Sequence, residues 1–227
     1  MENNSKLTSL KSAVNEFDLG GGAIQDIINI KEDDLANTSI VQDGTTSVSL
    51  DTDLLETAAG LTLAGSDNTI EPASEEFALG FDITEESNFI FNFQEGFSPV
   101  GGEIEHTGTV NFESVAGDIT VGDFTIGFDP SRQTEDISGF FVQNTVDSAV
   151  GDGTILFDVG NPENIEANES KLDLENSNLL VSPEFADVLQ STGLSADNLT
   201  GADVGDVTVN AIAESLLETS ANCVDWV

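Results

Sequence analysis

The sequence contains no tyrosine and only one tryptophan, one histidine and one cysteine. A single cysteine excludes an intramolecular disulfide, and the position of Cys223 near the end of the chain suggests an incidental thiol or an intermolecular one. Surfaces that recognise ligands by ring stacking tend to use Tyr and Trp. The 14 phenylalanines are therefore expected to pack in the core rather than to form a recognition surface.

Basic residues are scarce as well, because 5 Lys and Arg stand against 43 Asp and Glu and give a formal net charge of −38. No basic residue occurs between residues 32 and 131. Such a surface repels nucleic acid phosphates and anionic lipids, so neither is an expected partner. It attracts cations, and salt or bound divalent cations would relieve its self-repulsion. High salt and a calcium-rich extracellular matrix are the two settings that fit.

Long apolar runs are missing too. None reaches the roughly 18 residues of a membrane helix, so membrane insertion is not expected. The first 22 residues lack the apolar region of a secretory signal. They predict either a short helix over residues 5–19, ended by the glycines at 20–22, or a leader of the kind that peptidase-containing exporters remove at a glycine pair.

What is present is alternation of apolar and polar residues. In residues 101–129, Ile104, His106, Val110 and Phe112 share one face of a predicted strand, and mostly polar side chains share the other. A turn at residues 116–118 leads into a second strand. The apolar side chains of that strand change parity at Gly122-Asp123, which predicts a β-bulge there.

Similar patterns along the chain predict an all-β fold, an antiparallel β-sandwich or a barrel with one or two short helices. Asp43-Gly44 is a hairpin turn signal, and residues 77–93 also suggest a hairpin. Ser182-Pro183 predicts a helix over about residues 183–190. Residues 54–59 fit a helical turn or a strand equally well. We expect residues 1–37 to be an N-terminal helix or leader-like segment and linker, 38–214 the β-sandwich domain, and 215–227 a C-terminal tail.

Five segments carry a resemblance to known proteins: GGEIEHTGTVNF, DITVGDFTIGFD, GTILFDVGNP, LLVSPEFADVL and LTGADVGDVTVNA. Together they resemble a group of acidic, β-rich proteins of cyanobacterial type, often exported or found at the surface, over about residues 47–211. The segments are turns and strands, so the resemblance implies fold and setting but no activity. More loosely, a Gly-rich strand with Phe and His is similar to the haem-transport domains of some surface proteins. Those domains use a Tyr ligand, which this chain lacks.

No catalytic residue is predicted. His106, the single histidine, lies on the apolar face of its strand, so the favoured interpretation is a hydrogen-bonded histidine in the core or at its rim. A catalytic base would need a nucleophile, and no nucleophile-elbow motif is present. Paired carboxylates could serve glycoside hydrolysis, but sugar sites usually need Trp or Tyr platforms.

Calcium is the one metal with support in the sequence, because it binds six to eight oxygens from carboxylates, carbonyls and water. Several acidic loops offer such oxygens, although none matches an EF-hand. The candidate ligands are Asp147, Asp152, Asp197, Asp203 and Asp206. The alternative is that these are solvated loop acids.

The sequence therefore predicts a non-enzymatic, acidic protein of the cell surface or extracellular matrix, with a structural or interaction role and stabilised by salt or calcium. Its partners would be cations, an extracellular polysaccharide or another matrix protein. The alternative prediction is a β-sandwich module that binds a small ligand or a carbohydrate.

Overall fold

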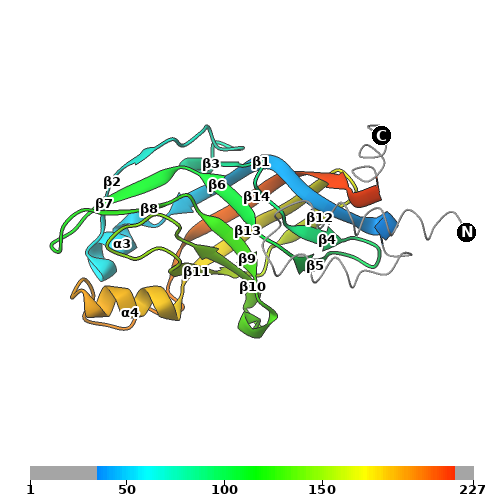
Figure 1. The fold of residues 1–227 in the computed structure, drawn as a ribbon. Helices are drawn as coiled ribbons and strands as arrows, with labels where there is room; N and C mark the ends of the chain where they lie inside the picture. The colour runs from blue at the N-terminus through cyan, green and yellow to red at the C-terminus, as the bar shows by residue number, and fades with distance from the viewer. Residues whose placement is uncertain (1–34, 218–227) are drawn as a thin grey trace, which may run out of the picture.

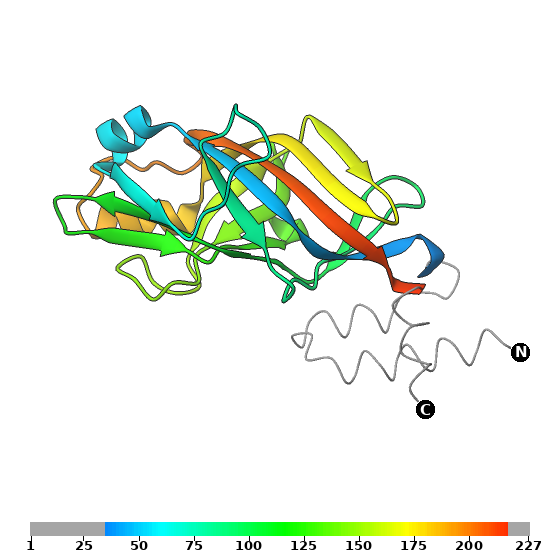
Figure 2. The ribbon, with the colours of Figure 1, turned by 90° about the horizontal axis from the view of Figure 1, so that it is seen from above.

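The computed structural model describes residues 35–217, and an antiparallel ring of eight strands is its main feature (Figures 1 and 2). Each strand pairs with the next, and the last one pairs with both β1 and β13, which closes the ring. In ring order the strands are β1 (Thr38–Leu50), β3 (Leu79–Ile83), β6 (Ile104–Thr107), β9 (Thr125–Phe128), β10 (Ile137–Gln143), β11 (Ile155–Gly160), β13 (Lys171–Val181) and β14 (Asp203–Ser215). The predicted all-β antiparallel fold is confirmed, in its barrel form.

Smaller elements extend the two ends of this barrel. A second sheet is formed by β2 (Thr62–Asp67), β7 (Thr109–Glu113) and β8 (Ile119–Gly122). It lies at the same end as the helices α3 (Thr52–Ala59) and α4 (Pro183–Ser191) (Figures 1 and 2). Towards the other end lie β4 (Ile90–Asn92), β5 (Ser98–Gly101) and β12 (Asn164–Ala167). Two short 3-10 turns complete the fold, η1 (Leu35–Asn37) and η2 (Pro130–Arg132).

The ribbon predicted over residues 101–129 forms and connects the two sheets. Its apolar face is buried, with Ile104, His106, Val110 and Phe112 between 0% and 6% exposed. β6 and β9 belong to the barrel, whereas β7 and β8 belong to the small sheet. The predicted irregularity lies where the ribbon passes from one sheet to the other: Asp123 has a φ of 43° and bonds through its amide to the carbonyl of Gly108. Only glycine fits at 122, because a Cβ there would lie 2.6 Å from the same carbonyl oxygen.

The turn predicted at residues 116–118 joins β7 to β8, but the hairpins predicted at Asp43-Gly44 and over residues 77–93 are wrong. Asp43-Gly44 does not turn the chain: β1 continues through it with a bulge between Val41 and Asp43, because β14 pairs with β1 over its whole length. Residues 77–93 contain two strands that do not pair with each other. β3 and β4 instead pair with successive parts of β1, so the loop between them is an excursion along one barrel wall rather than a hairpin turn.

Local signals at helix starts are more reliable. Ser182 caps α4 as predicted, and its hydroxyl oxygen accepts a hydrogen bond from the amide of Phe185 at 3.0 Å. Residues 54–59 belong to a helix, α3, whose N-cap is Asp51 and whose C-cap is the left-handed Gly60. The segment predicted at residues 5–19, together with Cys223 and Trp226, lies outside the described residues. No helix in the described part of the chain is long and apolar enough to cross a membrane.

Most of the buried apolar side chains belong to one core cluster. Phe140 fills part of it through ring contacts with Phe89, Phe97 and Phe128, at centroid distances of 5.2 to 6.1 Å. These rings confirm the prediction that phenylalanine is used for packing. Towards α3 and α4 the core is less completely filled, and a cavity remains there.

Candidate functional site

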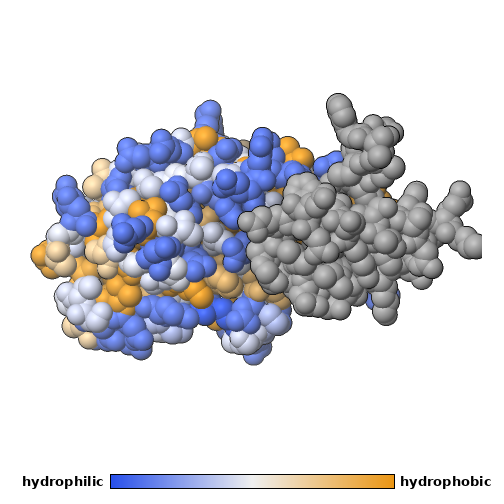
Figure 3. All heavy atoms as spheres, viewed as in Figure 1, coloured by the Kyte–Doolittle hydropathy of each residue, from blue (hydrophilic) through white to orange (hydrophobic). Residues whose placement is uncertain are grey.

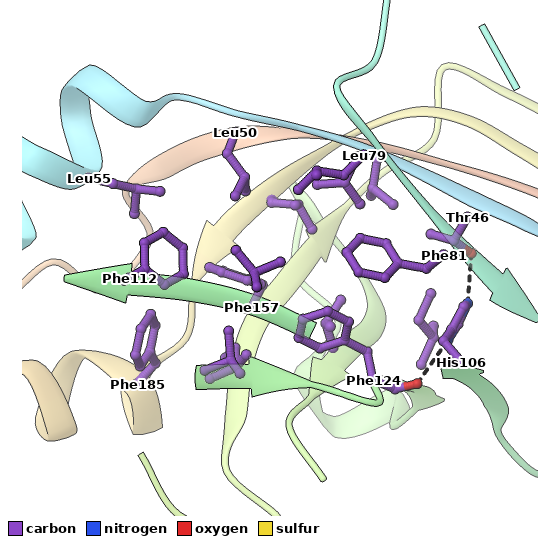
Figure 4. A pocket seen from close by; sticks show the side chains of 18 of the residues that line it. Thr46, Leu50, Leu55, Leu79, Phe81, His106, Phe112, Phe124, Phe157 and Phe185 are labelled. Carbon is purple, nitrogen blue, oxygen red and sulfur yellow. Dashed lines mark hydrogen bonds between the residues drawn. The ribbon is translucent and has the colours of Figure 1, made fainter. Parts of the chain in front are cut away.

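An apolar cavity of about 60 Å³ lies inside the barrel (Figure 4). Only apolar atoms face it, although Thr46 and His106 are among the residues around it. Leu55, Phe112 and Phe185 lie at one end in Figure 4, and Thr46 and His106 lie at the other. The cavity is therefore elongated in this view, and its lining is apolar along its whole length. A cavity lined in this way stays dry and accepts apolar guests.

His106 closes one end of the cavity with both ring nitrogens occupied. Nδ1 lies 2.9 Å from the carbonyl oxygen of Phe124, and Nε2 lies 2.7 Å from the hydroxyl of Thr46. A carbonyl only accepts, so Nδ1 carries the proton and Nε2 accepts from Thr46. Burial lowers the pKa of His106 to about 4, because the charged form loses its water. The ring is thus neutral at pH 7 and is a hydrogen-bonded histidine in the core, as the favoured interpretation predicted.

The opposite end lies against α4, and Phe185 is the residue of that helix that lines the cavity. Phe185 is 4% exposed and meets Phe157 edge-on, with ring centroids 5.9 Å apart. Two further cavities adjoin it, one of about 10 Å³ between α3 and α4 and one of about 110 Å³ beside α4. Phe185 is the one residue that lines all three cavities.

The 110 Å³ cavity beside α4 borders solvent, and we call it the α4 hollow. Its walls come from the β7–β8 turn, from the loop before β11, and from α4 and the residues that follow it. Exposed side chains at its rim show that it faces solvent: Ala116, Asp118, Ala149 and Thr192. In Figure 3, hydrophobic residues are exposed among polar ones at the end of the molecule that carries β7, β8 and α4.

A single arginine ties the start of α4 to the barrel. Arg132 binds Glu184 with two parallel bonds of 2.8 and 3.0 Å and binds Asp158 through Nε at 2.7 Å. Its guanidinium also lies 5.8 Å from the ring centre of Phe141. Hydrogen bonding to Arg132 lowers the pKa of Glu184. The Ser182 hydroxyl adds a second tie by donating to the carbonyl of Ile155 at 2.7 Å.

The predicted calcium ligands fall on three segments. Asp147 and Asp152 lie between β10 and β11, Asp197 follows α4, and Asp203 and Asp206 begin β14. Burial, and to a smaller extent the charges of Asp203 and Glu163, raise the pKa of Asp206.

Within residues 35–217, no three His, Cys, Asp or Glu side chains form a group that could hold a metal ion. The calcium site therefore stays a prediction.

Sequence reasoning missed the cavity, the position of Phe185 between three cavities and the tie through Arg132. Periodicity assigns a side chain to the inside of a sheet, but it does not show whether the inside is full. Two signals were available: Ser182-Pro183 located α4, and Arg132 is the single arginine of a very acidic chain.

No family model and no curated protein matches the sequence. Among solved structures, the crystal structure of the C-terminal domain of HtaA from Corynebacterium glutamicum is similar, with a TM-score of 0.51. The two sequences are 9% identical, and the similarity covers 77% of this chain and 99% of that domain. At this identity the likeness shows a shared fold alone.

Proposed function

We propose that this chain is a non-enzymatic domain of the cell surface or extracellular space that binds a small apolar molecule inside its barrel. The observation that carries the proposal is the elongated cavity that only apolar atoms face. Ligand sites are concave and mostly apolar, and the mouths of β-barrels are a preferred place for them. The acidic surface, with its charge of −38, supports the exported setting.

The volume of the cavity sets a condition on binding. A cavity of about 150 Å³ holds benzene, and sites for larger molecules measure about 300 to 1,000 Å³. The 60 Å³ cavity is smaller than either, so a ligand of useful size must enlarge it. Enlargement is easiest towards α4, where two more cavities lie on the other side of Phe185.

Support for a non-enzymatic role comes from the same site. His106 is the one titratable side chain among the residues that line the cavity, and both of its nitrogens already have partners. Neither nitrogen is available as a base or as a ligand to a metal or haem iron without breaking a buried hydrogen bond. The geometry therefore favours binding over chemistry.

A second candidate function is an acidic structural or interaction domain that salt or calcium stabilises. It is favoured by the shortage of basic partners for the carboxylates. Arg132 and Lys171, the two basic residues in the described range other than His106, each already pair with two carboxylates. Solvent cations must balance most of the other carboxylates. In this role the partner would be a polysaccharide or another matrix protein, and carbohydrate binding would occur on the surface.

Titration with N-phenyl-1-naphthylamine, a neutral apolar dye that fluoresces when it leaves water, tests the first proposal. We expect saturable binding to the wild-type protein and its loss in Val142→Phe, which fills the cavity with an aromatic ring. Val115→Ala is the matched control. Val115 is 94% exposed whereas Val142 is 8% exposed, so this variant should affect only dye that binds at the surface. Equal binding to the wild type and to Val142→Phe, or no binding at all, would contradict the proposal.

A further inference from the structure

We infer that the ligand is a neutral, elongated apolar molecule that reaches the barrel interior through the α4 hollow, with the side chain of Phe185 as the gate. The inference rests on the proposed function and adds the ligand class, the route and the residue that controls it. It starts from one juxtaposition. A surface hollow and an interior cavity share a single lining residue, Phe185.

Phe185 is placed so that its ring can move while its backbone stays fixed. Its amide bonds to the Ser182 hydroxyl, and the neighbouring Glu184 is held by Arg132. The start of α4 is therefore anchored on both sides. The ring itself makes an edge contact with Phe157, and space is available on three sides of it. Rotation of this ring is the smallest change that joins the hollow to the cavity.

The path behind the gate defines the shape of the ligand. It runs from Phe185 between Phe112 and Phe157 towards Phe124 and ends against His106 (Figure 4). No polar atom faces this path, because the polar atoms of Thr46 and His106 bond to each other or to the backbone. Nothing along it could stabilise a charge, and a long hydrocarbon chain fits it better than a compact polar molecule.

The charge of the ligand follows from the mouth of the path. The hollow is lined by apolar side chains such as Ile119, Val150 and Leu194, and Asp118 is its one charged lining residue. Asp187 on α4 and Asp147 on the loop that leads to Ala149 are exposed carboxylates on the same elements as the lining residues, although neither lines the hollow. The whole chain carries −38. An anionic amphiphile is repelled there, whereas a neutral one is not.

Stopped-flow fluorescence with two matched probes, a pyrene-labelled long-chain alcohol and the corresponding carboxylate, tests the inference. At low ionic strength we expect the alcohol to bind at least about tenfold more tightly than the carboxylate. Phe185→Ala should raise both the association and the dissociation rate of the alcohol by about tenfold or more, because a gate controls both directions.

Phe157→Ala is the matched control, because Phe157 packs on Phe185 and lines the interior cavity but not the hollow. It should change affinity without a parallel rise in both rates. Val188→Trp provides an independent variant, since Val188 lines the hollow alone and a larger ring there should slow association.

The outcomes separate the two proposals. If the alcohol binds the wild type but Phe185→Ala and Val188→Trp leave its rates unchanged, the route is wrong and interior binding stands. If the carboxylate binds as tightly as the alcohol, the ligand class is wrong. If no probe binds the wild type or Phe185→Ala, interior binding fails, and the inference fails with it.

Discussion

At the scale of single residues, His106 links the cavity to the pH dependence of folding. Its pKa is about 4 in the folded protein, against 6.5 for a histidine that is exposed to water in the unfolded chain. Above pH 6.5 the ring is neutral in both states and adds no pH dependence. As the pH falls from 6.5 towards 4, His106 becomes protonated in the unfolded chain but stays neutral in the folded protein. The free energy of unfolding therefore falls.

The predicted size of this loss is about 3 kcal/mol at most, reached near pH 4. Urea unfolding of the wild type and of His106→Gln across this range measures it. The carboxylates titrate in both proteins alike, so the difference between the two curves isolates the ring. We expect the wild type to lose stability faster than the variant as the pH drops. Parallel curves would show that His106 protonates as easily in the folded protein as in the unfolded chain.

Arg132 is the second residue whose substitution should change the free energy of unfolding. Its substitution by Lys removes the two-pronged bond to Glu184 and leaves Asp158, whose side chain is 8% exposed, with a poorer partner. We expect the free energy of unfolding to fall by about 2 kcal/mol, below the cost of breaking a fully buried pair because Glu184 is partly exposed.

Lys171→Ala is the control for this experiment, because that lysine also pairs with two carboxylates but its side chain is 37% exposed, against 16% for Arg132. It should change stability little. Chemical denaturation measures both variants. Equal effects would mean that Arg132 acts only as a surface charge.

At the scale of secondary structure elements, α4 depends on its first turn. Ser182 is fully buried and both accepts from the amide of Phe185 and donates to the carbonyl of Ile155. Ser182→Ala should therefore cost about 1 to 2 kcal/mol, the upper range for a helix cap. Hydrogen exchange should speed up in α4 and not in α3. Asp51→Ala, which removes the cap of α3, should give the reverse pattern. Uniform acceleration in both helices would show that α4 does not open by itself.

The elements also show where sequence reasoning works in this chain. Alternation correctly assigned the buried face of residues 104–112, because that pattern depends only on the pleat of one strand. Ser182-Pro183 located α4 because a helix cap is a local contact. Pairing is not local: Asp43-Gly44 has a turn composition, yet the pairing of β1 with β14 keeps the chain extended there. The fold class was therefore predictable, whereas the hairpin partners were not.

The candidate site was the least predictable part for the same reason. The cavity exists because β1, β6, β11 and α4 meet around it, and these elements are separated widely in sequence. No motif marks such a space, since its residues are ordinary core residues. His106 could be placed on the inner face, but its bond to Thr46, 60 positions away, required the closed barrel.

At the scale of the whole molecule, charge is the dominant constraint, and it opposes folding. Described carboxylates outnumber Arg132 and Lys171 many times over, so the barrel holds like charges close together. Apolar packing inside and cations outside must offset this repulsion. Raising the salt concentration screens charges beyond about 10 Å at 0.1 M and should therefore stabilise the fold.

Substitution of Asp206 tests whether repulsion between carboxylates destabilises the fold at one position. Its pKa is raised by partial burial and by the charges of Asp203 and Glu163, so its ionised form is unfavourable in the folded state. Asp206→Asn should therefore raise the melting temperature in low salt at neutral pH, and the gain should shrink as sodium chloride is added. Lowering the pH should also shrink it, because Asp206 gains its proton earlier in the folded protein than in the unfolded chain.

The same variant separates bound calcium from general screening. If calcium binds at the Asp203–Asp206 end of β14, millimolar calcium should stabilise the wild type more than sodium chloride of equal ionic strength does. Asp206→Asn should remove that excess, because it deletes one of the carboxylates that such a site would need. Asp152→Asn, on the β10–β11 loop, is the matched control and should keep it. Melting curves that respond alike to both salts in all three proteins would leave ionic strength as the stabilising factor, and the predicted calcium ligands would be solvated acids.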